Sequence, residues 1–151
     1  MAIFTSRFSN PELKKGIYTL VRISMGTPKW KIGYRIDGEL PDLMPFGLKG
    51  RAFAFFQQGY LARLDKIGVE KIKSRLQQFQ SDNKDLVLLC YEDIRKPGSW
   101  CHRTMFAEWW RKMTGETIEE LPDTVDKAFS KASKTPTNGF IAPPIQLTLL
   151  G

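Results

Sequence analysis

The stretch Leu86-Val87-Leu88-Leu89-Cys90-Tyr91 is a continuous apolar run that follows a polar turn. A run of this kind is typical of a central strand in a parallel sheet, because both faces of such a strand are covered by other layers. Upstream, residues 17–24 are rich in β-branched and aromatic side chains and predict a second buried strand, closed by Gly26 and Pro28. These two runs are the predicted core strands of the sheet, and the other elements are assigned around them.

Helical patterns occupy the chain between and after these strands. An apolar stripe with helical spacing covers residues 53–64, and a second, cleaner stripe covers residues 69–79. A third helix is predicted to begin at Cys101 or His102 and to end at Gly115. The side chains of this helix that are expected to face inward are Met105, Phe106, Trp109, Trp110 and Met113.

Shorter signals complete the order of elements. Residues 3–5 predict an edge strand, and residues 118–121 predict a last short strand. Ser9-Asn10-Pro11-Glu12 predicts a cap and one helical turn, which Gly16 ends. Residues 29–50 are rich in glycine and proline and are predicted to form a long loop. The order of strands and helices therefore predicts an α/β fold, a Rossmann-like three-layer sandwich with a mainly parallel sheet.

The length of 151 residues is typical of one domain, which we assign to residues 1–121. Residues 122–144 hold four of the nine prolines and predict a flexible linker, followed by an apolar peptide at 145–151. No run approaches the roughly 18 apolar residues that cross a bilayer, and the N-terminus has no apolar core of signal-peptide length. The sequence therefore predicts a cytoplasmic protein without a membrane partner, in which both cysteines are reduced.

The formal net charge of the chain is +7 and is spread along its length. This charge permits an anionic partner such as nucleic acid, and it is equally compatible with a role in solubility alone. Lys29-Trp30-Lys31 alternates basic and aromatic side chains within the predicted loop, which favours contact with a single-stranded nucleic acid. A lid over a pocket and a loop packed by its own tryptophan are the alternatives.

Cys101, His102 and Arg103 begin the third predicted helix, beyond the carboxyl end of the central strand. Ligands of parallel α/β sheets bind at this edge, and a helix N-terminus there favours anions and the ionised form of a thiol. We interpret Cys101 as a nucleophile, with His102 or Glu92 as its base. Arg103 and Arg22 are then expected to clamp a phosphate or carboxylate. The structural alternative is a buried inert cysteine beside a histidine that only caps the helix.

A second group of candidate ligand-binding residues follows the upstream strand. Arg22 and Ser24 lie on one face of that strand, because side chains alternate with a period of two. With Cys90, they are expected to contact the ligand. A buried arginine near a strand end requires an acidic partner, and Glu92 is the expected one. A purely structural ion pair is the alternative.

Cys90, Glu92, Cys101 and His102 are also residue types that bind metals. Adjacent cysteine and histidine side chains do not easily point at one ion, and their spacing matches no standard zinc pattern. The sequence therefore predicts neither a metal nor a cofactor.

The central strand through Glu92, a short proline–glycine spacer, Trp100-Cys101-His102-Arg103 and Ala107-Glu108-Trp109 together resemble the signature of domain-of-unknown-function family 488. Residues 5–10 and 22–30 also resemble this family, in its shorter branch from bacteria and phages. The resemblance covers about residues 1–122. It implies a Rossmann-like α/β fold with the motif at the carboxyl edge of the sheet, and it implies no particular reaction.

Gln146-Leu147-Thr148-Leu149-Leu150 resembles the pentapeptide by which many bacterial polymerases and repair proteins bind the replicative sliding clamp. The usual form is Gln-Leu-Ser/Asp-Leu-Phe, so Thr148 and Leu150 are the two departures. Gln146, Leu147, Leu149 and Leu150 are therefore candidate partner-binding residues, with the leucines in an apolar pocket and the amide on backbone groups. The alternative is a last strand that packs on the domain.

These observations together predict an α/β domain that binds, and acts on, a nucleotide, nucleic acid or other phosphorylated ligand at a Cys-His-Arg pocket. The C-terminal peptide is expected to recruit this domain to DNA replication or repair through the sliding clamp. The alternative is a non-catalytic nucleic-acid-binding or adaptor protein in which the Cys-His-Arg motif is structural.

Overall fold

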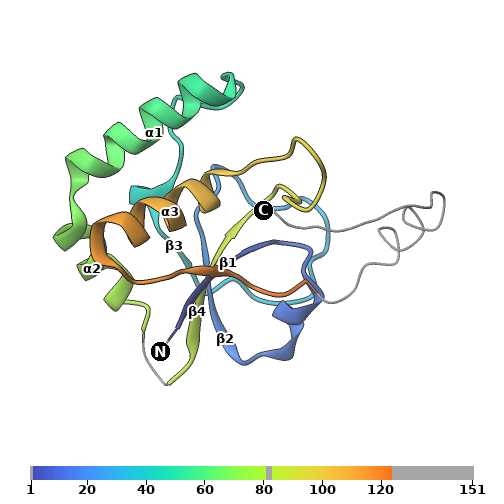
Figure 1. Cartoon of the computed structure of the whole chain (residues 1–151). Helices are drawn as coiled ribbons and strands as arrows, with labels where there is room; N and C mark the ends of the chain where they lie inside the picture. The colour runs from blue at the N-terminus through green and yellow to red at the C-terminus, as the bar shows by residue number, and fades with distance from the viewer. Residues whose placement is uncertain (1, 81–82, 124–151) are drawn as a thin grey trace, which may run out of the picture.

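The computed structural model describes residues 2–80 and 83–123 (Figure 1). Its centre is a five-stranded sheet with the order β3-β2-β4-β1-β5, in which every pair of strands is parallel. The strands are β1 (Ile3–Arg7), β2 (Tyr18–Arg22), β3 (Gly38–Glu39), β4 (Asp85–Cys90) and β5 (Glu119–Glu120). The predicted α/β fold with a mainly parallel sheet is confirmed.

β4 is the central strand, paired with β2 on one side and β1 on the other. Leu86 and Leu88 pack into the core beneath the helices, whereas Val87 and Leu89 pack into the core on the opposite face. All four side chains are completely buried. The run is continuously apolar because each face of β4 has its own hydrophobic core.

The three α-helices cover one face of the sheet (Figure 1). They are α1 (Phe53–Ile67), α2 (Val69–Gln77) and α3 (His102–Thr114). The opposite face is covered by the 3-10 helix η1 (Pro11–Lys15) and by Tyr34 and Ile36 of the following loop. The Asn10 side chain accepts a hydrogen bond from the Glu12 backbone N–H at 3.0 Å, so the predicted cap and helical turn are confirmed.

Four details of the fold differ from the sequence predictions. β1 is not an edge strand, because the two residues of β5 pair with its outer side. The predicted loop at 29–50 contains β3 and a 3-10 helix, η2 (Pro41–Leu43). Met113 is 52% exposed, since the core does not extend to residues 111–114 in the last turn of α3. The packed part of the chain continues past residue 121, because Asp123 forms an ion pair with Arg7 at 2.5 Å.

The chain leaves β2 toward β3 on one side of the sheet and leaves β4 toward β5 on the other side. β2 and β4 are adjacent, so their carboxyl ends form the crevice where ligands bind in open parallel sheets. Ser24 follows β2 and Cys90 ends β4 at this crevice. None of the helices in the described ranges combines the length and apolar character that crossing a bilayer requires.

Candidate active site

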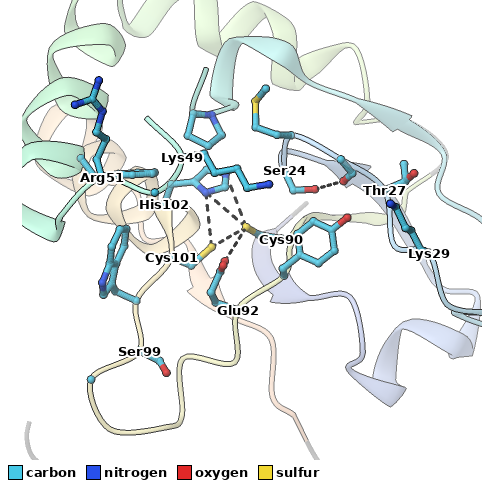
Figure 2. Close-up of a pocket in the computed structure, with 18 residues that line it drawn as sticks. Ser24, Thr27, Lys29, Lys49, Arg51, Cys90, Glu92, Ser99, Cys101 and His102 are labelled. Carbon is cyan, nitrogen blue, oxygen red and sulfur yellow. Dashed lines mark hydrogen bonds between the residues drawn. The ribbon is translucent and has the colours of Figure 1, made fainter. Parts of the chain in front are cut away.

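A pocket of about 770 Å³ opens beyond the carboxyl ends of β2 and β4 (Figure 2). Four segments form most of its wall: residues 24–29 after β2, residues 45–51 before α1, residues 90–92 at the end of β4, and residues 98–102 at the start of α3. The carboxyl edge that the sequence indicated as the ligand site is therefore hollowed into a pocket.

Two cysteines and the single histidine of the chain form a buried cluster that lines this pocket (Figure 2). The Sγ atoms of Cys90 and Cys101 lie 2.7 Å apart. The His102 Nδ1 atom lies 3.5 Å from the Cys90 sulfur and 3.7 Å from the Cys101 sulfur. The structure thus brings together three of the residues that the sequence selected.

The orientation of His102 is set by a backbone carbonyl. Its Nε2 atom lies 2.7 Å from the carbonyl oxygen of Ile23, which only accepts hydrogen bonds. Nε2 therefore carries a proton, and Nδ1 faces the two sulfurs. The Tyr60 ring packs edge-on against the imidazole, with 5.4 Å between ring centroids. In this position Nδ1 can accept a proton from a thiol or, once protonated, donate to a thiolate.

The two thiols have opposite acidities. Burial opposes ionisation of Cys101, but hydrogen bonds from Cys90 and His102 and the charge of Arg103 outweigh it and lower the Cys101 pKa well below the ordinary value. Burial, together with the hydrogen bond and the negative charge at Cys101, holds the pKa of Cys90 well above the ordinary value. Cys101 is also the N-cap residue of α3, where the helix dipole favours an anion. These surroundings favour the thiolate form at Cys101 over the thiolate form at Cys90.

Glu92 is the carboxylate of the pocket. Its pKa is raised from the ordinary value, mainly by burial and next by the negative charge of Cys101. One of its carboxylate oxygens lies 3.5 Å from the Cys90 sulfur. A carboxyl group with a raised pKa beside a thiolate can donate or accept a proton in a reaction at that sulfur.

Cys90, Cys101 and His102 are the described residues that could hold a metal ion, since their ligand atoms lie within 4.8 Å of one another. Adjacent Cys101 and His102 were not expected to point easily at one ion, but their side chains do meet. Cys101 has an extended backbone and His102 is the first helical residue, so both side chains turn toward Cys90. The nitrogen–sulfur distances suit a tetrahedral zinc site, but its two sulfurs would lie about 3.7 Å apart, given zinc–sulfur bonds of roughly 2.3 Å.

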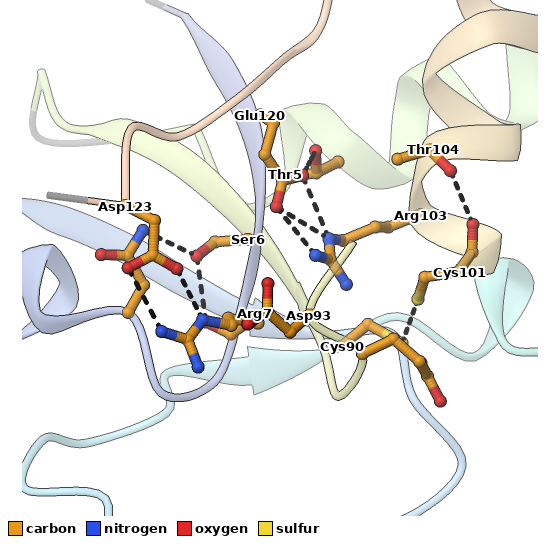
Figure 3. A network of polar contacts seen from close by, with 12 residues as sticks. Thr5, Ser6, Arg7, Cys90, Asp93, Cys101, Arg103, Thr104, Glu120 and Asp123 are labelled. Carbon is orange, nitrogen blue, oxygen red and sulfur yellow. Dashed lines mark hydrogen bonds and ion pairs between the residues drawn. The ribbon is translucent and has the colours of Figure 1, made fainter. Parts of the chain in front are cut away.

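Arg103 lies outside the pocket, contrary to its predicted role as a ligand clamp. Its side chain is fully buried, and its Nε and Nη2 atoms donate to the Glu120 carboxylate at 3.0 and 2.8 Å (Figure 3). Within the described ranges, the Arg103 Nη1 atom has no hydrogen-bond partner. Arg103 still affects the site, because its charge is among the causes of the lowered Cys101 pKa.

The predicted pairing of Arg22 with Glu92 is also wrong. Arg22 forms an ion pair with Glu39 and donates to the carbonyl oxygen of Ser24 at 2.6 Å. β3 causes this difference, because it places Glu39 directly opposite Arg22 in the sheet register. Arg22 does not line the pocket, whereas Ser24 does, with its hydroxyl donating to the Gly26 carbonyl at 2.6 Å.

Of the predicted nucleic-acid residues, only Lys29 lines the pocket. Trp30 is 49% exposed and packs edge-on against Tyr91, with 6.0 Å between ring centroids. Lys31 is exposed and does not line the pocket. The three residues therefore do not form one binding surface within the pocket.

Two pocket cations were not identified from the sequence. Lys49 and Arg51 lie in the segment before α1 and line the pocket. The Lys49 side chain reaches toward the cysteine–histidine cluster, whereas the Arg51 guanidinium points away from it and lies over the Phe55 ring, 4.9 Å from the ring centroid (Figure 2). The available signal was a Lys-Gly-Arg triplet immediately before a helical stripe. Such a triplet does not show which way its charges face.

The segment that carries these cations is held against α1. The Tyr60 hydroxyl donates to the carbonyl oxygen of Leu43 at 2.6 Å, and the Arg63 guanidinium donates to the carbonyl oxygen of Met44 at 2.9 Å. Leu48 packs so closely on Gly59 that a Cβ atom there would lie 3.0 Å from its side chain. Gly59 is therefore the residue that lets this wall of the pocket approach the helix.

The candidate clamp-binding residues Gln146, Leu147, Leu149 and Leu150 lie outside the described residues. Comparisons with models of protein families, with curated proteins and with solved structures each found no match. The resemblance to domain-of-unknown-function family 488 therefore stays a prediction. The fold and the site define the chain as an α/β protein with an all-parallel sheet and a cysteine–histidine pocket at its carboxyl edge.

Proposed function

We propose that this domain binds a phosphorylated ligand of the nucleotide or nucleic-acid class in the pocket and acts on it through Cys101. One observation carries the proposal: three cationic side chains line the same pocket as the buried cysteine–histidine cluster. Among the described residues that line the pocket, these cations are Lys29, Lys49 and Arg51, against the single carboxylate of Glu92. Such an excess of positive charge favours phosphate groups.

The aromatic wall of the pocket supports a ligand that carries a base. Tyr91, Trp100 and Phe56 line the pocket, and Trp100 packs edge-on against Phe56 with 4.9 Å between centroids. Aromatic faces stack on nucleobases without selecting a particular base. The pocket volume of about 770 Å³ is within the range of small-molecule sites.

The reaction that this arrangement supports is attack by the Cys101 thiolate on the phosphorus atom. The sulfur–phosphorus bond forms, the bond from phosphorus to the leaving oxygen breaks, and protonated Glu92 supplies the proton of the leaving group. Water then attacks the phosphorus atom and gives a proton to the Glu92 carboxylate, while the sulfur–phosphorus bond breaks and the Cys101 thiolate is restored. The N-terminus of α3 stabilises the negative charge that develops on the phosphoryl oxygens.

Ligand binding tests the proposal directly. We expect Lys49→Ala and Arg51→Ala each to weaken binding of a nucleoside diphosphate about tenfold, since a hydrogen bond to a charged group contributes roughly 1.5 kcal/mol or more. Titration calorimetry of the reduced full chain measures the affinity. Lys31→Ala is the matched control, because Lys31 is exposed and outside the pocket. An equal loss in all three variants, or no binding to the unaltered chain, would contradict the proposal.

We also propose that the C-terminal peptide recruits the domain to a bacterial sliding clamp, on the strength of its sequence alone. The intact chain is expected to bind purified clamp, and a chain truncated after Pro144 is expected to lose that binding. Thr148→Ser should retain binding, because serine is usual at this position of the motif. If the truncated and intact chains bind alike, or neither binds, recruitment by this peptide is refuted.

A further inference from the structure

We propose that Cys90 and Cys101 form a reversible disulfide when the protein meets a low-molecular-weight disulfide, and that this bond switches off the nucleophile. The chemistry of bond formation depends only on the two cysteines and their neighbours. The regulatory consequence rests on the function proposed above.

The geometry of the two sulfurs carries the inference. They lie 2.7 Å apart, and a disulfide bond is about 2.05 Å long, so closure requires a movement of only about 0.7 Å. Cys90 ends β4 and Cys101 is the N-cap residue of α3, so both belong to the packed framework. No loop has to rearrange to bring them together.

A tetrahedral metal site would require the opposite movement. Two thiolates on one zinc ion lie about 3.7 Å apart, given zinc–sulfur bonds of roughly 2.3 Å. Cys90 and Cys101 would therefore have to separate by about 1 Å to hold the ion, given their distance of 2.7 Å. The sulfur pair is closer to a disulfide than to a zinc site, and bound zinc becomes an outcome of the test.

The surroundings distinguish the attacking sulfur from the resolving sulfur. Both cysteines are buried from bulk solvent but line the pocket, so a small oxidant reaches them through its opening. The charge of Arg103 and the N-terminus of α3 favour the thiolate at Cys101. Cys90 keeps its proton and lies 3.5 Å from the His102 Nδ1 atom, which can accept that proton.

The exchange proceeds in two steps. The Cys101 thiolate attacks one sulfur of oxidised glutathione, so that a mixed disulfide forms and one glutathione thiolate leaves. The leaving glutathione thiolate takes the proton with which His102 Nδ1 hydrogen-bonds Cys101, so Nδ1 is free to accept a proton. Cys90 then loses its proton to Nδ1 and attacks the Cys101 sulfur, releasing the second glutathione thiolate. The two cysteine sulfurs have given two electrons to the oxidant, and the two released thiolates take up the proton of Cys90 and one further proton from His102 or the solvent. Excess reduced glutathione reverses both steps.

Oxidation is expected to separate binding from reaction. The disulfide removes the thiolate that attacks phosphorus, so turnover stops. It also removes a negative charge beside the phosphate subsite, while the pocket cations Lys29, Lys49 and Arg51 remain. The oxidised protein should therefore still bind the phosphorylated ligand.

Intact-mass measurement tests the disulfide without any ligand. The full chain is reduced, freed of metals with a chelator, and incubated with oxidised glutathione at neutral pH. We expect loss of the mass of two hydrogens per chain, restoration by dithiothreitol, and a Cys90–Cys101 cross-link in the peptide map. Iodoacetamide labelling should fall at least tenfold after oxidation.

Two variants report the order of the steps. In Cys90→Ser the mixed disulfide cannot be resolved, so one glutathione per chain should accumulate on Cys101. In Cys101→Ser adduct formation should be much slower, because the attacking thiolate is absent. If a variant does not fold, the peptide map of the unaltered chain still decides the proposal.

The disulfide proposal fails if glutathione adducts accumulate on the unaltered chain without a cross-link. It also fails if metal analysis of protein purified without chelator finds one zinc per chain that protects both thiols from labelling. Failure of the proposed function is distinct, since it appears as absent phosphate binding in the reduced chain whatever happens to the cysteines.

Discussion

Glu120→Ala is expected to lower the free energy of unfolding by about 3 kcal/mol, because it leaves the fully buried Arg103 guanidinium without its counter-charge. This loss of stability is near the lower end of the range for a broken buried ion pair, because Glu120 is 31% exposed and water partly replaces its carboxylate. Urea unfolding followed by tryptophan fluorescence measures the change, and the slope should be unaltered.

An exposed ion pair on α3, the helix that carries Arg103, is the matched control. Glu108 and Arg111 contact each other at 2.6 Å, but both side chains are about half exposed. Glu108→Ala should therefore cost less than about 1 kcal/mol. The double variant Arg103→Met/Glu120→Met should recover most of the stability lost in Glu120→Ala, because no unpaired charge remains. Similar losses for Glu120→Ala and Glu108→Ala would contradict a buried ion pair.

Iodoacetamide is expected to label Cys101 at pH values where an ordinary thiol is unreactive. The pKa of Cys101 lies well below its usual value, because hydrogen bonds from Cys90 and His102 and the charge of Arg103 outweigh the effect of burial. A thiol loses its proton as the pH rises through its pKa, so the labelling rate of Cys101 should reach its plateau at a clearly lower pH in the folded protein than in the unfolded chain. Cys90 should stay unlabelled over the same range, since its pKa is raised.

The control for this measurement is the unfolded chain. In denaturant both cysteines should follow the profile of a free thiol, with a midpoint near pH 8.5. Cys90→Ala should shift the Cys101 profile toward higher pH, because it removes a hydrogen-bond donor to the thiolate. A folded protein whose Cys101 profile matches that of the unfolded chain would show that the cysteine is inert.

Much of the fold is predictable from local sequence. The central position of β4 follows from a run that is apolar on both faces, and α1, α2 and α3 follow from stripes of helical spacing. The place of β1 in the sheet does not follow. The sequence predicts a short strand at residues 118–121, and β5 (Glu119–Glu120) confirms it, but local composition does not show that this strand pairs with Phe4 and Thr5 on the outer side of β1.

The candidate site was predictable in part. Cys90, Cys101 and His102 meet because the end of a strand and the start of the next helix share the carboxyl edge of a parallel sheet. The partners of the arginines were not predictable, because they depend on strand register. Glu39 reaches Arg22 through the two-residue strand β3, and Arg103 turns away from the pocket toward β5.

The attachment of residues 43–48 to α1 has a consequence for the rate and cost of ligand capture. Lys49 and Arg51 directly follow a segment that is tied to α1 by hydrogen bonds from Tyr60 and Arg63. The backbone before these charges is therefore already ordered when the ligand arrives, and little chain entropy is lost on association. Capture should proceed as a single bimolecular step limited by diffusion and charge, rather than waiting for a loop to close.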